Sequence, residues 1–181
     1  MTADNAFPFD AADDALRGVL DAAGPAIAGE SPCPDWTGID VLHHLIDTER
    51  SFMEKVGFDL GPAPTANEPS TLWSQHADQL RPLLARQDVL DTKYSTSMGE
   101  STVAGMLSLI YGFDLLVHRW DVARSAGHDT RFTDAELDAM EASIRQLGDM
   151  LYSPGAFVAG VTAAPDADRQ TRVLAVLGRK V

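Results

Sequence analysis

Residues 102–126 of this chain read TVAGMLSLIYGFDLLVHRWDVARSA, and their pattern decides the fold. When Leu107 is the reference direction and each residue advances by about 100°, the period of an α-helix, the apolar side chains gather on one face. Those within about 80° of the reference are Val103, Ile110, Tyr111 and Val117. The stretch therefore predicts one long helix, and Gly127 suits the left-handed residue that often ends a helix.

The opposite face of this predicted helix is also apolar, because it carries Leu109, Phe113, Leu116 and Trp120. A helix that is apolar almost all round is buried on every side, either in the centre of a bundle or against another protein chain. We predict the central position, and formation of a homodimer is compatible with it.

Further helices are expected on both sides of this one. Two of them begin with a Thr that has an acidic residue three positions later, which is the spacing of a capping box: Thr37 with Asp40, and Thr133 with Glu136. The expected segments are about 10–23, 37–56, 70–86 and 133–152.

Two local features interrupt this pattern. Pro82 lies inside the third segment, where the ring removes a backbone hydrogen bond, so we expect a kink or a break near Arg81. The stretch 91–100 favours extended structure and a short hairpin. After residue 152 the chain is rich in Pro, Gly and Ala and closes with a short apolar turn at 173–177.

Four or five helices, each with an apolar stripe, pack most simply as a bundle. The predicted fold class is therefore all-α, with one domain over residues 1–181 and a C-terminal tail at 153–181. The chain has 181 residues, 45% hydrophobic and 23% charged, which is ordinary for a globular domain of this size.

Charge and cysteine content exclude several classes of partner. The net charge is −13, which repels nucleic acid and anionic lipid, so no nucleic-acid or membrane partner is expected. The N-terminus has no basic, apolar leader, and no apolar stretch is long enough to span a membrane. The single cysteine, Cys33, fits a reducing compartment, and we expect a cytoplasmic protein.

The helix at 102–126 carries unexpected polar groups. Asp114, His118 and Asp121 lie inside its apolar arc, and an ionised carboxylate in an apolar core costs several kcal/mol unless a cation or good donors meet it. A divalent metal would remove this cost, because Asp114 and His118 project together as residues i and i+4. The third ligand must come from another helix, and periodicity leaves His43, His44 and His76 open.

Each of these residues also has an interpretation without a metal. Asp114 and His118 can form a buried acid–imidazole hydrogen bond. Asp121 can bind directly, can hold a ligating His in place, or can pair with Arg124 or Arg50, and this ion pair is favoured over direct ligation. His43 and His76 are expected to be exposed. Cys33 lies between two prolines, which favours a rigid corner over a nucleophile.

Two motifs carry a family resemblance. CPDWTGIDVLHHL (33–45) and DLLVHRWDVARSAG (114–127) resemble the actinobacterial DinB-like proteins, in particular the branch related to mycothiol-dependent maleylpyruvate isomerase. The ending PDADRQTRVLAVLGR (165–179) is similar to a short metal-binding subfamily of that group.

The resemblance implies a DinB-like four-helix bundle, here with an additional helix, that holds a divalent metal, zinc or nickel, in a cleft. It implies that His44 and His118 are metal ligands, with Asp114 in the place where isomerase-like members have a Glu. Members that use thiols are transferases or isomerases, so the implied partners are a low-molecular-weight thiol, such as mycothiol, and a small electrophile.

Full isomerases carry a sizeable second domain, whereas this chain has about thirty residues after its fifth helix, so maleylpyruvate isomerisation itself is not expected. We therefore predict a metal- and thiol-dependent enzyme of the transferase or isomerase type. The alternatives are a non-catalytic metal-binding or stress-related bundle, and a bundle whose polar core groups satisfy one another without a metal.

Overall fold

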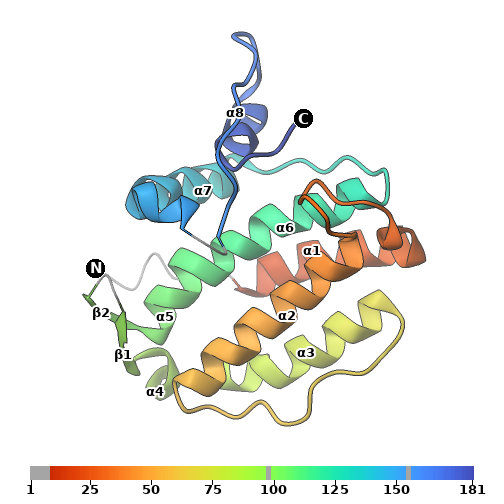
Figure 1. Ribbon diagram of the computed structural model, residues 1–181. Helices are drawn as coiled ribbons and strands as arrows, with labels where there is room; N and C mark the ends of the chain where they lie inside the picture. The colour runs from red at the N-terminus through yellow and green to blue at the C-terminus, as the bar shows by residue number, and fades with distance from the viewer. Residues whose placement is uncertain (1–8, 97–98, 154–155) are drawn as a thin grey trace.

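The computed structural model describes residues 9–96, 99–153 and 156–181, and these form an all-α DinB-like bundle with one small hairpin (Figure 1). This confirms the predicted fold class. The four long helices of the bundle are α1 (Phe9–Ala23), α2 (Gly38–Lys55), α3 (Pro69–Leu84) and α6 (Gly112–Ser125). Their shared core contains Leu16, Leu20, Ile27, Leu42, Leu45, Ile46, Trp73 and Leu115.

Helix α6 lies at the centre of the molecule, as its apolar circumference predicts. One side packs against α1 and α2, and the other packs against α7 (Asp134–Leu147). This second side contributes Phe113, Leu116 and Trp120 to a separate apolar cluster with Leu137 and Met140. Because contacts within the chain bury α6, its apolarity needs no second subunit, and dimerisation stays a prediction.

Both predicted capping boxes are present. The Thr37 hydroxyl accepts a hydrogen bond from the Asp40 amide while the Asp40 carboxylate accepts one from the Thr37 amide, and Thr133 and Glu136 do the same at the start of α7. After the C-terminal end of α6, Gly127 has a φ of +74°, so the predicted left-handed residue is confirmed. These signals fix where α2 starts and where α6 ends.

Two helices differ from the prediction. Helix α3 is not split at Pro82; it continues to Leu84, because only its last turn follows the proline. The predicted helix 102–126 is not uniform. It consists of α5 (Val103–Met106), a π-helical turn (Leu107–Tyr111) and α6. Such turns insert a residue into a helix and are frequent near functional sites.

The predicted hairpin is confirmed, one helical turn after α3. A short helix, α4 (Gln87–Leu90), leads into β1 (Lys93–Thr96), which pairs antiparallel with β2 (Gly99–Thr102). The tip of the hairpin, residues 97–98, lies outside the described residues. The hairpin then delivers the chain to Thr102, whose hydroxyl caps α5.

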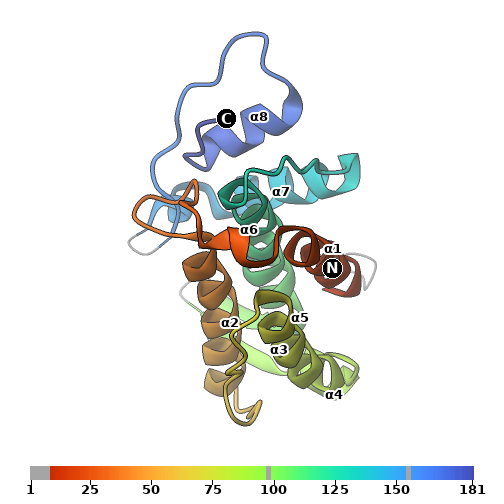
Figure 2. The same cartoon turned by 90° about the vertical axis from the view of Figure 1, so that its right-hand side faces the viewer.

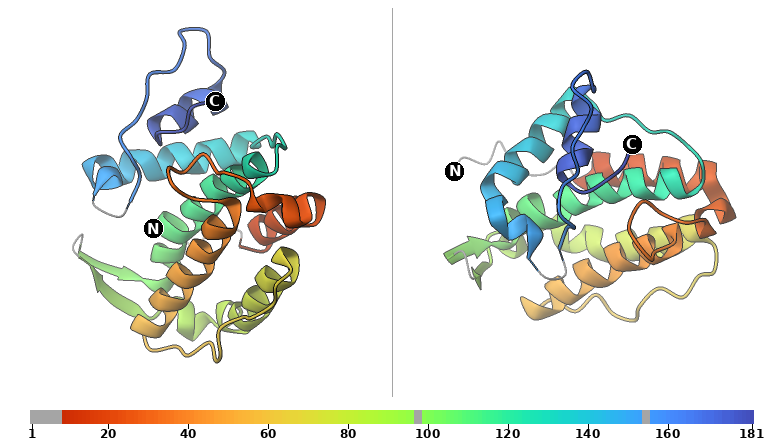
Figure 3. Two further views of the ribbon diagram at one scale, coloured as in Figure 1. Left: turned by 45° about the vertical axis from the view of Figure 1, so that its right-hand side comes forward. Right: turned by 45° about the horizontal axis from the view of Figure 1, so that its top comes forward.

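The C-terminal segment packs on the rest of the protein and is not a loose tail. The predicted apolar turn is part of a helix, α8 (Arg169–Val176), which lies beside α7 (Figures 2 and 3). Val173, Leu174 and Leu177 join the cluster formed by α6 and α7. Arg169 binds Asp138 and Glu141, so α8 partly neutralises the acidic face of α7.

Among the described residues, no helix is long and apolar enough to cross a membrane.

Candidate metal centre

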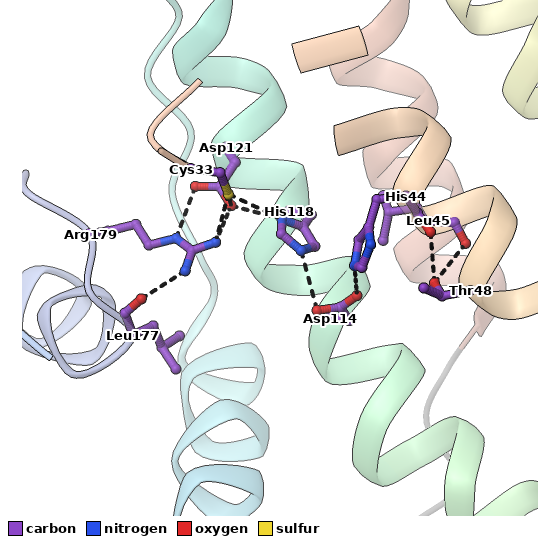
Figure 4. A network of polar contacts seen from close by, with 9 residues as sticks. All are labelled: Cys33, His44, Leu45, Thr48, Asp114, His118, Asp121, Leu177 and Arg179. Atoms are coloured by element: carbon purple, nitrogen blue, oxygen red, sulfur yellow. Dashed lines mark hydrogen bonds and ion pairs between the residues drawn. The ribbon is translucent and has the colours of Figure 1, made fainter. Parts of the chain in front are cut away.

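His44, Asp114 and His118 meet at the interface between α2 and α6 (Figure 4). His44 Nε2 lies 3.0 Å from Asp114 Oδ2, and His118 Nε2 lies 3.3 Å from Asp114 Oδ1. The two helices run antiparallel, because Gly38 at the start of α2 lies against Ser125 at the end of α6. This register brings a histidine of the second helix opposite the Asp114–His118 pair.

The structure separates the two adjacent histidines that periodicity left open. His43 is exposed on the outer face of α2, whereas His44 faces α6. The side chains of His44 and Asp114 remain 24% and 18% exposed, and that of His118 only 6%. The group is therefore anchored in the core at His118 and open to solvent at His44.

The charges of the site stabilise one another. Burial alone would lower the pKa of His118, but the Asp114 carboxylate and the hydrogen bonds to Asp114 and Asp121 outweigh it and hold that pKa well above its ordinary value. Burial alone would raise the pKa of Asp114, but the charge of His118 and hydrogen bonds from both histidines lower it. The carboxylate is thus held as an anion that attracts a cation.

The three residues fit a divalent metal by donor type and spacing. Their ligand atoms, two imidazole nitrogens and one carboxylate oxygen, all lie within 4.8 Å of one another. Two donors about 2.1 Å from one tetrahedral ion are about 3.4 Å apart, close to the observed 3.0 and 3.3 Å. The shorter Asp side chain therefore reaches both histidines. Zinc and nickel both accept this donor set.

Asp121 lies on the other side of the His118 ring. Its Oδ2 is 2.8 Å from His118 Nδ1, so it accepts the hydrogen bond of the nitrogen that does not face Asp114. The predicted ion pair of Asp121 exists, but with a different partner: Arg179 Nη2 lies 2.6 Å from the same oxygen. Arg50 and Arg124 were the wrong candidates. Arg50 binds Gln79, and Arg124 lies over the ring of Trp120.

Cys33 belongs to the same group. Its sulfur lies 3.3 Å from Asp121 Oδ2, 4.0 Å from His118 Nδ1 and 3.0 Å from Arg179 Nη2. Cys33, His118 and Asp121 thus form a second set of donors within metal-ligand spacing. Arg179 already provides a cation between the sulfur and the carboxylate, so the set with His44 is the better metal candidate.

The loop between α1 and α2 places Cys33 over α6. Gly29 and Gly38 approach Ser125 so closely that a Cβ atom on either would lie 2.3 and 2.1 Å from it. Asp35 turns the chain with a φ of +65°, a conformation that Asp tolerates better than most residues. The corner expected from the prolines is real, and its function is to bring Cys33 to the site.

Two aromatic side chains flank the histidines. The Trp36 ring lies 5.0 Å from that of His44, and the Phe157 ring stacks on His118 at 6.4 Å. Trp36 is 36% exposed, so it does not lie in the core. Trp36 and Phe157 thus line the two sides of the histidine pair.

His76 is not part of this group, and the expectation that it is exposed is wrong. It is fully buried, and its Nε2 lies 2.7 Å from Glu49 Oε2. Burial raises the pKa of Glu49 against the opposing effect of the His76 hydrogen bond. The pair is a separate acid–imidazole contact in the core.

A groove of about 390 Å³ lies between α2, β1 and the turns that precede α6. Thr48 lies one turn beyond His44, and Tyr111 lies one turn before Asp114. The groove is lined by Asp47, Thr48, Ser51, Phe52, Lys55, Tyr94, Met106 and Tyr111. Its size suits a small molecule.

Comparison with known proteins places these helices in a family. The model of the mycothiol maleylpyruvate isomerase N-terminal domain matches residues 9–123, which include His44, Asp114, His118 and Asp121. The chain belongs to this family. Members of the mycothiol maleylpyruvate isomerase N-terminal domain family thus share the part of the chain from α1 to near the end of α6.

Two relatives match the chain over most of its length. They are uncharacterized proteins of Mycobacterium tuberculosis, from the strains CDC 1551 / Oshkosh and ATCC 25618 / H37Rv. Each is 26% identical over an alignment of 179 residues that covers 94% of this chain and 94% of the relative. No solved structure gives a significant match. The similarity to these relatives therefore extends beyond the family segment into the C-terminal part.

The sequence interpretation missed the contributions of Cys33, Phe157 and Arg179. Arg179 is 58 residues from Asp121, and Cys33 is 88 residues from it, so no helical spacing links them. The only sequence signal for Arg179 was its place in the ending that resembles a metal-binding subfamily.

Proposed function

We propose that this chain binds one zinc or nickel ion through His44, Asp114 and His118 and is a thiol-dependent transferase or isomerase-like enzyme of the cytoplasm. Its substrates would be a low-molecular-weight thiol of the mycothiol type and a small electrophile. The observation that carries the proposal is that the imidazoles of His44 and His118 converge on the ionised carboxylate of Asp114. This contact lies at the end of the site that is open to solvent, whereas Arg179 neutralises Asp121 at the buried end.

A divalent ion at this position lowers the pKa of a thiol or water that it binds and fixes its orientation. Three protein ligands leave a coordination position for a substrate, the pattern of catalytic rather than structural sites. The open side of His44 and Asp114 is where that position would face solvent.

The side chains around the three ligands would do the remaining work. Asp121 holds His118 with Nε2 directed at Asp114. Trp36 covers one side of His44 and limits the access of water there. The groove that begins at Thr48 and Tyr111 provides room for the rest of the bound thiol or electrophile, and Lys55 in its lining can attract a carboxylate.

The whole chain would act as one domain. The family segment ends at residue 123, but α7, α8 and the end of the chain pack on α6 and reach Asp121. We therefore include residues 153–181 in the same domain as the bundle.

Metal analysis tests the first part of the proposal. The untagged protein is purified without chelator, loaded with zinc or nickel, desalted and analysed by mass spectrometry of the elements. Wild type should retain about one ion per chain, and His118→Ala should retain little, because a ligand buried in the core is lost. Wild-type protein that takes up neither metal would refute the proposal.

Turnover tests the second part. Metal-loaded protein is mixed with mycothiol and electrophiles of several classes, such as epoxides, unsaturated diacids and chlorinated aromatics, and consumption of the thiol is followed. Conversion that requires both metal and thiol supports an enzyme. Retained metal without conversion of any electrophile favours the alternative, a metal-binding or stress-related bundle.

A further inference from the structure

Arg179 lies at the end of the chain, yet it is buried beside the proposed metal ligands. The residue is only 4% exposed. Its guanidinium donates to Asp121 through two nitrogens, with Nη2 at 2.6 Å from Oδ2 and Nε at 3.2 Å from Oδ1. It also donates to the Leu177 carbonyl at 2.7 Å and lies over the Phe157 ring at 5.2 Å. A charged side chain is buried in this way only when its charge and donors are matched.

The backbone after α8 is built to deliver this side chain. The Arg179 amide donates to the Leu174 carbonyl, and the Gly178 amide donates to the Ala175 carbonyl, which together form a Schellman motif. Gly178 has a φ of +80°, and a Cβ atom there would lie 2.3 Å from Val158. Glycine is therefore required, and the turn reverses the chain so that Arg179 points inward.

One oxygen atom of Asp121 links Arg179 to His118, which is a candidate metal ligand. Asp121 Oδ2 accepts from Arg179 Nη2 and lies 2.8 Å from His118 Nδ1. With the Asp121 carboxylate fixed as an acceptor, Nδ1 of His118 would carry the hydrogen. Its Nε2 is directed at Asp114, as Figure 4 shows. Partners of this kind set the tautomer and the ring orientation of metal-binding histidines.

We infer that Arg179 is a positioning residue, which orients His118 for metal binding by fixing Asp121. This rests on the proposed metal site. It assigns to the C-terminal segment, beyond the residues 9–123 that the family shares, a role in the metal centre. Arg179 also places its charge beside Cys33, since Arg179 Nη2 is 3.0 Å from the sulfur.

The first measurement is zinc affinity, by competition with a chromophoric chelator. Arg179→Met keeps much of the volume of the side chain and removes its charge and donors, and it should bind zinc about 10–100-fold more weakly. Arg179→Lys keeps the charge but not the two-nitrogen contact, and it should fall between wild type and Arg179→Met. Arg172→Ala removes an exposed arginine of α8, the helix that precedes Arg179, and should stay within about twofold of wild type.

A double-mutant comparison separates positioning from general destabilisation. If Arg179 acts through Asp121, Asp121→Asn should weaken zinc binding, and adding Arg179→Met should cause little further loss. The absorption spectrum of the cobalt-substituted protein should change in Arg179→Met and not in Arg172→Ala, because ligand geometry changes only in the first. Equal zinc affinity and equal cobalt spectra for wild type, Arg179→Met and Arg179→Lys would overturn the inference.

A readout without metal distinguishes this inference from the proposed function. Cys33 is half-buried, and the Arg179 guanidinium both covers its sulfur and donates to it, so the metal-free Arg179→Met variant should react with a disulfide reagent at a rate severalfold different from that of wild type. An unchanged rate would contradict the docking of Arg179 and overturn the inference even if wild type binds zinc. If the rate changes as expected but wild type binds no zinc or nickel, the proposed function fails instead, and the role of Arg179 toward the metal fails with it.

Discussion

Glu49 with His76, and Asp114 with His44 and His118, are two acid–imidazole groups built from the same kinds of side chain in one helical core. In the first, the side chains of His76 and Glu49 are 0% and 3% exposed, with one carboxylate facing one imidazole. In the second, Asp114 faces two imidazoles, and the side chains of His44 and Asp114 are 24% and 18% exposed.

The difference lies in the number of donors and in access to solvent. The Glu49–His76 pair shows that this core can satisfy a buried acid with a single imidazole. Asp114 has one imidazole more than that task requires, and the extra one, His44, lies at the surface. Donors that exceed the needs of one carboxylate, converge on one point and face solvent are the arrangement that a bound metal uses.

Breaking the contact between Glu49 and His76, here called the closed pair, should have the largest effect on stability. We expect Glu49→Ala to lower the free energy of unfolding by about 3–5 kcal/mol, because it leaves His76 buried without its partner. Urea denaturation in the presence of a chelator measures this. Replacing both residues by Leu should cost much less, since no unpaired polar group remains. A loss below about 1 kcal/mol in Glu49→Ala would show that the pair is not closed in solution.

Zinc should stabilise the folded protein by binding to His44, Asp114 and His118, here called the open group, and not by binding to the closed pair. At a free zinc concentration of about 100 times Kd, we expect about 2.7 kcal/mol of added stability, seen as a higher melting temperature that a chelator reverses. His118→Ala should abolish this increment, whereas Glu49→Gln should retain it. If a chelator leaves the melting temperature of zinc-treated wild type unchanged, Asp114 and its histidines form a self-satisfied group like Glu49 and His76.

The pH dependence of stability should report on the closed pair. Burial raises the pKa of Glu49 above its ordinary 4.5 against the hydrogen bond and charge of His76, and the charges of Asp114 and Asp13 raise it further. The folded chain therefore keeps the proton of the Glu49 carboxyl group at pH values where the unfolded chain has lost it. Stability should fall as pH rises from about 4.5 through the folded pKa, by at most about 1.4 kcal/mol per pH unit.

Glu49→Gln isolates this contribution because it cannot titrate. The free energy of unfolding of wild type minus that of Glu49→Gln, measured by urea denaturation with chelator present, should decrease with pH in this range. The lowered pKa values of Asp114 and Asp121 act below the ordinary range for Asp and in the opposite direction, and both variants share them. A difference that stays constant or rises with pH would contradict the raised pKa of Glu49.

Local patterns in the sequence predicted the bundle well. Capping boxes at Thr37 and Thr133, the apolar circumference of α6 and the left-handed Gly127 each depend on residues within four positions of one another. The spacing of Asp114 and His118 belongs to the same class. These features are confirmed because helix geometry alone sets them. The π-helical turn at Leu107–Tyr111 was missed because it inserts into an otherwise regular apolar pattern.

Contacts between residues that are far apart in the sequence could not be predicted from such local patterns. His76 has the polarity of a surface residue, and only the tertiary placement of Glu49 opposite it makes burial acceptable. The partner of Asp121 was sought among nearby arginines, but Arg179 reaches it from a turn after α8. The two flanks of His118 therefore differ in predictability: Asp114 follows from the helix, while the Arg179 contact depends on how the C-terminal segment folds back.

The smallest effect should come from His43, which lies next to His44 in sequence and differs from it only in the face of α2 that it occupies. His43 is exposed and points away from α6, so we expect His43→Ala to change zinc affinity by less than about twofold. His44→Ala in the same titration should weaken binding far more, because a ligand is lost. Since the two variants remove the same side chain from adjacent positions, their difference measures orientation alone. Equal losses would mean that zinc binds at the surface of α2 and that the open group at Asp114 is not its site.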